Sequence, residues 1–318
     1  MNYLALDIGG TKTSAALFTG EGVLLETSFK TAATETEKGE EAVYETARAL
    51  VQAALDSAEG GARGIGVGSP GPLNREHGII LHAPLMGWRN FPIVQRLAAD
   101  FKLPVRLDND GNLGALAEGR AGVAKAVPNL VYITVSTGCG GGIIADGKLY
   151  HGAHDSAGEI GHFSIDPQGP PCPCGSHGCF ELYASGTALL DKMRLDMKAG
   201  KQSLVFKLAA FQPEKLSGRL LDQAAAAGDE YALSLYQQEG FYLGAGLANV
   251  FNMLDPEVIV LGGGITKGRH FFHDKMMETL AERCLRKPAE DAVRYSVLND
   301  RVVLYGAYFL IKEAMENI

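Results

Sequence analysis

The sequence predicts an α/β protein with two domains, a duplicated strand–loop–strand unit and a structural metal site. Three observations support this prediction. Strand-like and helix-like segments alternate along the chain, one order of strands and glycine loops occurs twice, and a histidine precedes a close group of three cysteines. With 318 residues, the chain is long enough for about two domains that each bury a core.

The first copy of the duplicated unit opens the chain. Apolar runs separated by glycine turns predict three strands, the last at 23–25, with a glycine loop at 9–11. From residue 129 the same order of strand, loop, strand, turn and strand returns, now with a glycine loop at 136–142. Two similar loops about 130 residues apart indicate a duplication, with one copy in each domain.

The two glycine loops are suited to binding phosphate. In the first, backbone N–H groups, the hydroxyl of Thr11 or Thr13 and the ammonium of Lys12 can surround a phosphate. Asp7, at the end of the first strand, could hold Mg²⁺ through water. Alone, this segment also fits a plain β-meander. The second loop favours a nucleotide triphosphate held from both sides of a cleft.

A polar turn follows the strand at 105–107 and leads into a helix. It contains Asp108, Asn109 and Asp110. A carboxylate at such a position commonly caps the helix. The functional alternative is that Asp110 points into the cleft as a general base, with Asn109 holding a substrate hydroxyl. Composition does not choose between Asp108 and Asp110.

His162, Cys172, Cys174 and Cys179 predict a structural zinc site. The cysteines read C-x-C-x4-C, and the histidine stands ten positions before the first of them. One imidazole and three thiolates complete a tetrahedral set and leave no position for a catalytic water. A stray group of reduced cysteines or a disulfide is the alternative, but nothing else in the chain suggests an oxidising compartment.

The last third of the chain contains a second candidate for nucleotide contact. A strand at 258–261 ends in three glycines at 262–264, which would let the backbone lie flat against an adenine or ribose. The same pattern is also common at strand–helix corners. We expect a last strand at 301–305 and a last helix at 306–315.

Composition limits the class of protein. Hydrophobic residues make up 46% and charged residues 21%, as in ordinary globular proteins. A net charge of −8 argues against a broad nucleic-acid surface. No apolar run approaches the roughly 20 residues of a membrane span, and the N-terminus lacks a signal-peptide pattern. We therefore expect a cytoplasmic protein without nucleic-acid or membrane partners.

Together, the motifs resemble the ROK family of sugar kinases and repressors. The resemblance rests on LALDIGGTKTSAALF, RLDNDGNLGALAE, ITVSTGCGGGII, GEIGH with CPCGSHGCFELYASG, and VIVLGGGI, which follow the family order over essentially the whole chain. It implies the two-domain actin/Hsp70/hexokinase-like ATPase fold, built from duplicated RNase H-like units. Its implied domains are a small one at 1–117, completed by the helix 306–318, and a large one at 118–305 with the zinc loop.

The resemblance also implies an activity. ROK kinases transfer the γ-phosphoryl of ATP to a sugar hydroxyl, usually O6, with Mg²⁺ and a structural Zn²⁺, and a homodimer is the family expectation. Glucose is the first candidate acceptor; N-acetylmannosamine, N-acetylglucosamine and fructose are alternatives. A non-catalytic, sugar-responsive regulator is disfavoured because no helix-turn-helix precedes Asp7. The intact set of sugar-side residues argues against a zinc-stapled ATPase or filament protein.

The resemblance assigns roles residue by residue. Asp110 is the catalytic base, and one nitrogen of His162 binds zinc while the other faces the sugar. The implied sugar-binding residues are Gly71, Asn109, Asp110, Glu159, His162 and Glu181. The implied nucleotide and magnesium residues are Asp7, Gly9, Gly10, Thr11, Lys12, Thr137, Gly138, Gly140, Gly262, Gly263 and Gly264.

Two positions depart from the family pattern. Leu85 stands where many members carry an asparagine, and we expect this difference to change the sugar-side lining. Cys139 occupies a position that is more often isoleucine or valine, and we expect it to act as a small buried hydrophobe.

Overall fold

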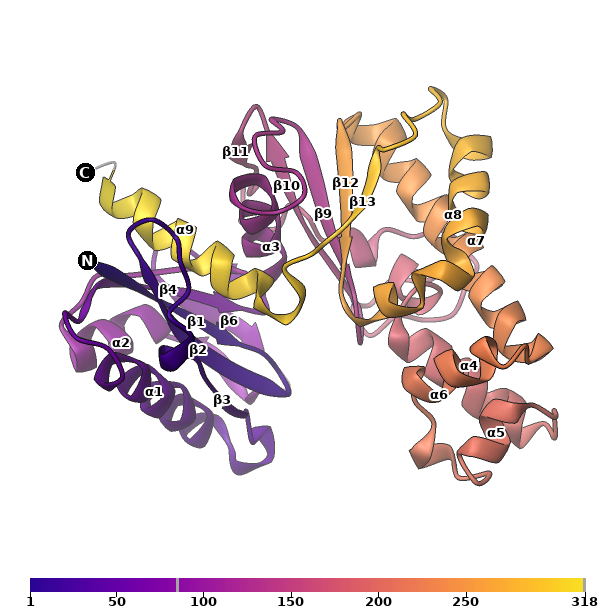
Figure 1. Ribbon diagram of the computed structural model, residues 1–318, viewed down its shortest axis with the longest axis horizontal. Helices are drawn as coiled ribbons and strands as arrows, with labels where there is room; N and C mark the ends of the chain where they lie inside the picture. The colour runs from indigo at the N-terminus through magenta and orange to yellow at the C-terminus, as the bar shows by residue number, and fades with distance from the viewer. Residues whose placement is uncertain (84–85, 317–318) are drawn as a thin grey trace. The chain divides into compact units, whose positions relative to one another are not determined.

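The computed structural model describes residues 1–83 and 86–316 (Figure 1). The chain divides into two compact units. Unit 1 contains residues 1–132, 141–158 and the stretch from Ser296 onward, and unit 2 contains 133–140 and 159–295. The domain boundaries expected from the sequence stay a prediction.

Unit 1 contains a mixed five-stranded sheet in the order β3-β2-β1-β4-β8. β1 (Asn2–Ile8) pairs antiparallel with β2 (Lys12–Thr19), which pairs antiparallel with β3 (Lys30–Ala33). On its other side, β1 runs parallel to β4 (Ala62–Ser69), and β4 runs parallel to β8 (Val105–Asn109).

Helices cover both faces of this sheet because β1 is apolar on both sides. Alternate residues of a strand point to opposite faces. Leu4 and Leu6 pack with α1 (Glu40–Asp56) and α2 (Ile93–Phe101), while Tyr3 and Ala5 pack with α9 (Val302–Glu316). The two hydrophobic cores that result hold the carboxyl ends of β1, β4 and β8 in fixed positions.

Two further parts complete unit 1. The small sheet of β5 (Leu73–Asn74), β6 (Ile79–Ala83) and β7 (Trp88–Phe91) adds Leu73 and Trp88 to the core with α1. α3 (Asp110–Arg120) packs against α9 at Gly306, where a Cβ atom would come within 2.0 Å of the Leu113 carbonyl oxygen. Only glycine permits this close approach of two helices.

The second sheet repeats the topology of the first. Its order is β11-β10-β9-β12-β13, so the first strand of each copy is central, with the next two on one side and the last two on the other. The duplication and the fold class predicted from the glycine loops are therefore confirmed. The strands are β9 (Leu130–Val135), β10 (Cys139–Ala145), β11 (Lys148–Leu149), β12 (Val258–Gly262) and β13 (Val293–Tyr295).

The remaining regular elements of unit 2 are mostly helices. Ser185, Ser217 and Asp229 cap the starts of α4, α6 and α7, each accepting a bond from a backbone N–H three residues later. α7 packs closely on α8 through Gly240 and Gly244. The helices are α4 (Gly186–Lys198), α5 (Leu204–Leu208), α6 (Gly218–Ala226), α7 (Glu230–Leu254) and α8 (Arg269–Arg283).

Two predicted strands are wrong. At 23–25 only Leu24 makes an isolated bridge, and the third strand lies at 30–33 instead. Residues 302–305 belong to α9, because the apolar residues of 302–311 recur at helical spacing and pack on the sheet, which overrides their β-propensity. Leu85, which we expected to affect the choice of sugar, lies outside the described residues.

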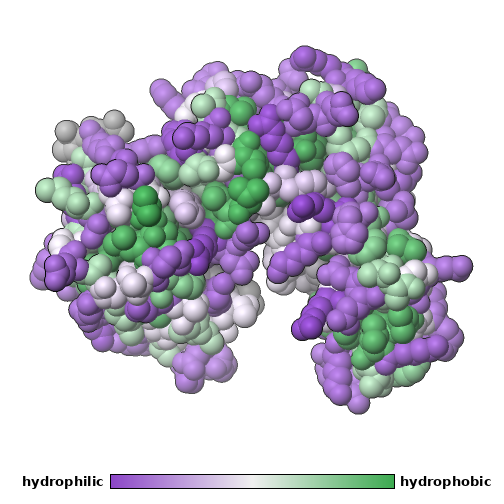
Figure 2. Space-filling model, in the orientation of Figure 1, coloured by the Kyte–Doolittle hydropathy of each residue, from purple (hydrophilic) through white to green (hydrophobic). Residues whose placement is uncertain are grey.

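None of the described helices is long and apolar enough to cross a bilayer. On the face shown in Figure 2, hydrophobic residues reach the surface in separate patches, one of them over α4 to α6. Leu195, Leu208 and Phe211 are the large exposed apolar side chains of that region.

Candidate active site

The corner between β8 and α3 separates its two acids. Asn109 caps the helix, since its Oδ1 accepts a hydrogen bond from Gly111 N at 2.8 Å. Asp108 is fully buried and ion-paired, whereas Asp110 is only partly buried at the first position of α3. A Cβ atom on Gly71 would lie 3.4 Å from Asn109 Nδ2, so this glycine adjoins the cap. Asp110 is thus the accessible carboxylate of the corner.

Asp7 and Asp110 influence each other in unit 1. Burial of the Asp7 carboxyl and the negative charge of Asp110 raise the pKa of Asp7 to about 7, against an opposing effect of Lys12. A cation near two such carboxyls would relieve their repulsion, and carboxylate oxygens are the ligands that Mg²⁺ prefers. The chemistry of this pair therefore fits a magnesium ion.

The first glycine loop distinguishes the two candidate hydroxyls. Thr13 is fully buried and its Oγ1 lies 3.0 Å from that of Thr34, whereas Thr11 is exposed. Thr34 also donates to the Gly9 carbonyl oxygen at 2.6 Å and, through its backbone N–H, to that of Thr11 at 3.0 Å. Thr13 thus stabilises the loop, and Thr11 is the hydroxyl that a ligand can reach. Gly10 and Lys12 lie beside it at the surface.

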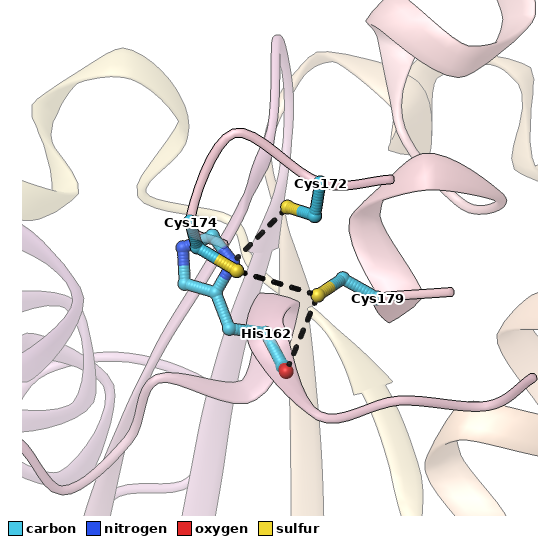
Figure 3. Close-up of side chains that lie close together, drawn as sticks. All are labelled: His162, Cys172, Cys174 and Cys179. Atoms are coloured by element: carbon cyan, nitrogen blue, oxygen red, sulfur yellow. Dashed lines mark hydrogen bonds between the residues drawn. The ribbon is translucent and has the colours of Figure 1, made fainter. Parts of the chain in front are cut away.

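In unit 2 the four predicted zinc ligands converge. One ligand atom from each of His162, Cys172, Cys174 and Cys179 lies within 4.8 Å of the others (Figure 3). The sulfurs of Cys174 and Cys179 are 3.6 Å apart, and Cys172 Sγ lies 3.9 Å from His162 Nδ1. A tetrahedral ion with bonds of about 2.3 Å needs ligand separations of about 3.8 Å. A disulfide needs sulfurs about 2.05 Å apart. The cluster fits zinc.

Glu181 links this cluster to the second glycine loop. Its Oε1 lies 3.3 Å from His162 Nδ1 and 3.6 Å from Cys172 Sγ. A Cβ atom on Gly138 would lie 2.9 Å from Glu181 Oε2, so the carboxylate covers the loop. Glu159 is exposed just ahead of the short helix Ile160–His162, and its carbonyl oxygen accepts from His162 N at 3.0 Å.

The second glycine loop lies at the start of α4. Gly186 N donates to the Ser136 carbonyl oxygen at 2.7 Å, and Thr187 N donates to that of Thr137 at 3.2 Å. A cavity of about 440 Å³ opens here, a volume within the range of small-molecule sites. Its lining joins the loop to α4, α6, α7 and the short helix Gly264–Gly268 that follows β12, and includes Ser136, Thr137, Thr187, Arg219, Asp222, Tyr236, Gly264 and Lys267.

The glycines predicted to contact the nucleotide differ in whether they line this cavity. Gly264 lines it, whereas Gly262 is buried in β12 and Gly263 packs on β9, where a Cβ atom would come within 2.2 Å of the Val135 carbonyl oxygen. Gly140 lies in β10, outside the cavity lining. The sequence motifs did not indicate Thr187, Arg219 or Lys267. The Ser185 cap is the one available signal, since it marks a helix N-terminus of the kind that binds anions.

A second cavity, of about 590 Å³, adjoins the first in unit 2. Thr137, Gly138 and Glu181 line one side of it, and α4 and α7 line the other. Cys139 is buried nearby and donates through Sγ to the Ala184 carbonyl oxygen. It therefore packs as a small buried residue, as predicted.

Comparison with known proteins shows what the chain is similar to. The chain is 33% identical over 318 residues to a glucokinase of Halalkalibacterium halodurans, covering 98% of this chain and 95% of the relative. A ROK family glucokinase from Streptomyces griseus, solved with glucose and AMPPNP, matches with a TM-score of 0.85 and 30% identity, covering 98% of this chain and 99% of that one.

A regulator is also similar. The xylose repressor of Caldicellulosiruptor bescii is 33% identical over 252 residues, which cover 79% of this chain and 63% of the repressor. The family model for the ROK family matches residues 3–314. The resemblance seen in the motifs is confirmed, and the chain belongs to the ROK family.

Proposed function

We propose that this protein is an ATP-dependent sugar kinase that transfers the γ-phosphoryl of ATP to the 6-hydroxyl of a hexose, with glucose as the preferred acceptor. The observation that carries the proposal is the β8–α3 corner, where Asp108 is sealed in ion pairs and Asp110 is accessible beside Asn109 and Gly71. The relatives named glucokinase, from Halalkalibacterium halodurans and Streptomyces griseus, support the substrate class.

Asp110 acts as the general base in this proposal. Its carboxylate takes the proton of the sugar hydroxyl as the oxygen attacks the γ-phosphorus, a contribution of about 10²–10⁴-fold to the rate. Asn109 and Gly71 hold neighbouring hydroxyls. Phosphoryl transfer otherwise depends on positioning and on neutralising charge, so the remaining work falls to the phosphate-binding groups.

Unit 2 supplies further sugar contacts and the nucleotide site. Glu159, Glu181 and His162 form hydrogen bonds with sugar hydroxyls, and a zinc ion held by the cluster would fix the ring orientation of His162. The cavity of about 440 Å³ binds the adenosine part of ATP. Thr137 and Gly138, at its edge, donate hydrogen bonds to phosphate oxygens. AMPPNP in the Streptomyces griseus relative supports ATP as the donor.

Unit 1 supplies the other phosphate contacts. Thr11, Lys12 and the backbone of the first glycine loop bind phosphate oxygens, and Asp7 holds Mg²⁺ through water. When bound, Mg²⁺ neutralises the charge that develops on the β- and γ-phosphates. Asp7 would hold the ion, and Asp110 stays available to take the sugar proton.

A coupled assay of ADP release tests the proposal. With Mg·ATP, the protein is given glucose, mannose, fructose, N-acetylglucosamine and N-acetylmannosamine in turn. We expect kcat/KM for glucose to exceed the others. A higher value for an N-acylated sugar would change the acceptor but keep the kinase, whereas no ADP release with any sugar would contradict the proposal.

The similarity to the xylose repressor supports one alternative of another class, a sugar-binding regulator without turnover. The two functions are separated by measuring sugar binding calorimetrically beside turnover. Binding of glucose without ADP release would favour the regulator.

We also propose a cytoplasmic homodimer. Met253 and Leu285 on unit 2 are 74% and 94% exposed, and large apolar side chains at the surface favour association. Light scattering after size-exclusion chromatography tests the dimer; a mass near 33.8 kDa would contradict it.

A further inference from the structure

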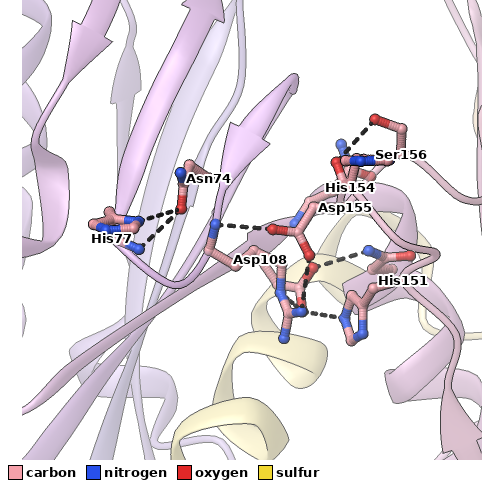
Figure 4. Close-up of polar contacts among 10 residues, drawn as sticks. Asn74, His77, Asp108, His151, His154, Asp155 and Ser156 are labelled. Atoms are coloured by element: carbon pink, nitrogen blue, oxygen red, sulfur yellow. Dashed lines mark hydrogen bonds and ion pairs between the residues drawn. The ribbon is translucent and has the colours of Figure 1, made fainter.

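The carboxylate of Asp108 has four polar partners although its side chain is fully buried. Oδ1 accepts hydrogen bonds from Asn109 N at 2.8 Å and from Asn112 Nδ2 at 2.9 Å. Oδ2 lies 3.0 Å from Arg75 Nε and 2.9 Å from His151 Nε2 (Figure 4). A carboxylate only accepts hydrogen bonds, so Nε2 of His151 carries the proton of this bond.

The bonds of Oδ1 fix the corner that bears the base. They join Asp108 to the next residue and to the first turn of α3, so they set the direction in which the chain enters the helix. Asn109 continues this chain of bonds by accepting from Gly111 N. Asp110 lies between these bonded residues, and its backbone is held on both sides.

The partners of Oδ2 come from two other segments of unit 1. Arg75 belongs to the turn between β5 and β6, and His151 to the loop after β11. Asp155, in the same loop as His151, accepts from Arg75 N at 3.1 Å and from Arg75 Nη1 at 3.3 Å. The His151 carbonyl oxygen accepts from Ala157 N at 3.0 Å, which closes the loop. Arg75 thus bridges two carboxylates.

Helix capping does not explain these partners. A cap needs one acceptor at the N-terminus, and Asn109 provides it. The second oxygen of Asp108 instead ties the corner to two loops, through the Arg75 guanidinium, which neutralises its charge, and through the N–H group of His151. Loss of either group would leave a buried charge short of a partner, and the corner would shift to rehydrate it.

We propose that Arg75 and His151 are positioning residues of the kinase reaction: by holding Asp108, they keep the carboxylate of Asp110 in the geometry that proton removal requires. This inference rests on the proposed function and adds two residues to its machinery. Neither residue belongs to the set drawn from the family motifs. A displacement of about 1 Å at a reacting group can cost about 10²-fold in rate, which gives the expected scale.

The test compares four variants of the full chain. R75M and H151L remove the partners of Asp108, H151Q keeps a donor near the position of Nε2, and R48M removes a matched exposed ion pair with Glu45 on α1. We expect R75M and H151L to lower kcat by about 10–100-fold and to change the KM for the sugar by less than about 3-fold. H151Q should keep most of the kcat, and R48M all of it.

Hydrogen exchange at the corner gives a second readout that does not depend on turnover. The amides of Asn109 and Gly111 donate to side chains fixed by this arrangement, so their exchange should quicken in R75M and H151L and stay unchanged in R48M.

Three results would overturn the proposal. An unchanged kcat in R75M and H151L would mean that the ion pairs only stabilise the fold, even where the melting temperature falls. An equal loss in H151Q and H151L would mean that the hydrogen bond is not the cause. If the unmodified protein phosphorylates no sugar, the proposed function fails, and unchanged exchange at the corner would then overturn the positioning role separately.

Discussion

The two units hold their functional side chains in different ways. In unit 1 the chain itself completes the arrangement, since the buried carboxylate of Asp108 is paired by Arg75 and His151, and the buried hydroxyl of Thr13 by Thr34. In unit 2 the four ligand atoms around His162 converge at the spacing of a tetrahedral ion. We infer that unit 1 is organised by side-chain pairing and unit 2 by a metal.

The buried acids sharpen this contrast. Asp108 uses both of its oxygens, whereas neither oxygen of Glu239, on α7, has a hydrogen-bond partner among the described residues. Both side chains are almost fully buried. Unit 1 therefore balances its buried charge within the fold, and unit 2 contains an acid whose charged form the fold does not favour.

The largest effect is expected at the corner of unit 1. Asp110→Asn should lower kcat by about 10²–10⁴-fold, because the amide cannot accept the sugar proton. Sugar affinity should stay within about 3-fold, since the asparagine amide has nearly the same size as the acid and keeps one acceptor oxygen. Turnover assays and calorimetry measure the two quantities, and a normal kcat would disprove the base assignment. Asp146→Asn is the matched control, because this exposed acid of the turn between β10 and β11 lies in the same unit and outside the proposed site.

The metal dependence of unit 2 gives the next effect. Cys174→Ser should lose zinc and weaken sugar binding by about 10–100-fold, because His162 then loses the metal ion that orients its ring. Cys284→Ser is the control, since this cysteine lies outside the cluster. Metal analysis and calorimetry of both variants measure the outcome. Sugar affinity that survives zinc loss unchanged would contradict a role of the metal in organising unit 2.

The sequence predicted the repeated topology and the zinc ligands because both depend on local patterns. Glycine loops fix turns, and cysteine spacing fixes a ligand set. Composition could not separate Asp108 from Asp110, and only the family resemblance did, because the difference lies in Arg75 and His151, which come from distant segments. For the same reason Thr187, Arg219 and Lys267 were missed: the cavity that they line exists only once α4, α6 and the short helix Gly264–Gly268 are packed.

The two threonines of the first glycine loop test the internal pairing of unit 1 on a smaller scale. Thr13→Val should cost about 0.5–1.5 kcal/mol of unfolding free energy, the net contribution of one hydrogen bond, because the Thr34 hydroxyl loses its bond to Thr13 and keeps the one to the Gly9 carbonyl oxygen. Thr11→Val should leave stability unchanged and lower kcat/KM for ATP by about 10-fold, the scale of one hydrogen bond to a charged group. Denaturant unfolding and initial rates measure the two effects. The reverse pattern would exchange the roles of the two hydroxyls.

The smallest effect is expected from the unpaired acid of unit 2. Burial raises the pKa of Glu239 well above its ordinary value of 4.5, so the folded state favours the protonated form. The stability that this form provides is fully present below pH 4.5 and is lost progressively as the pH rises toward the folded-state pKa. Glu239→Gln cannot ionise, so its unfolding free energy should fall less between pH 5 and pH 8 than that of the unmodified protein. A difference of about 1 kcal/mol corresponds to about 2–4 °C in melting temperature.

Glu230→Gln, at the exposed start of the same helix, controls for loss of charge on α7. Identical pH slopes in all three proteins would show that Glu239 finds a partner in solution, and the contrast between the two units would then rest on the metal alone.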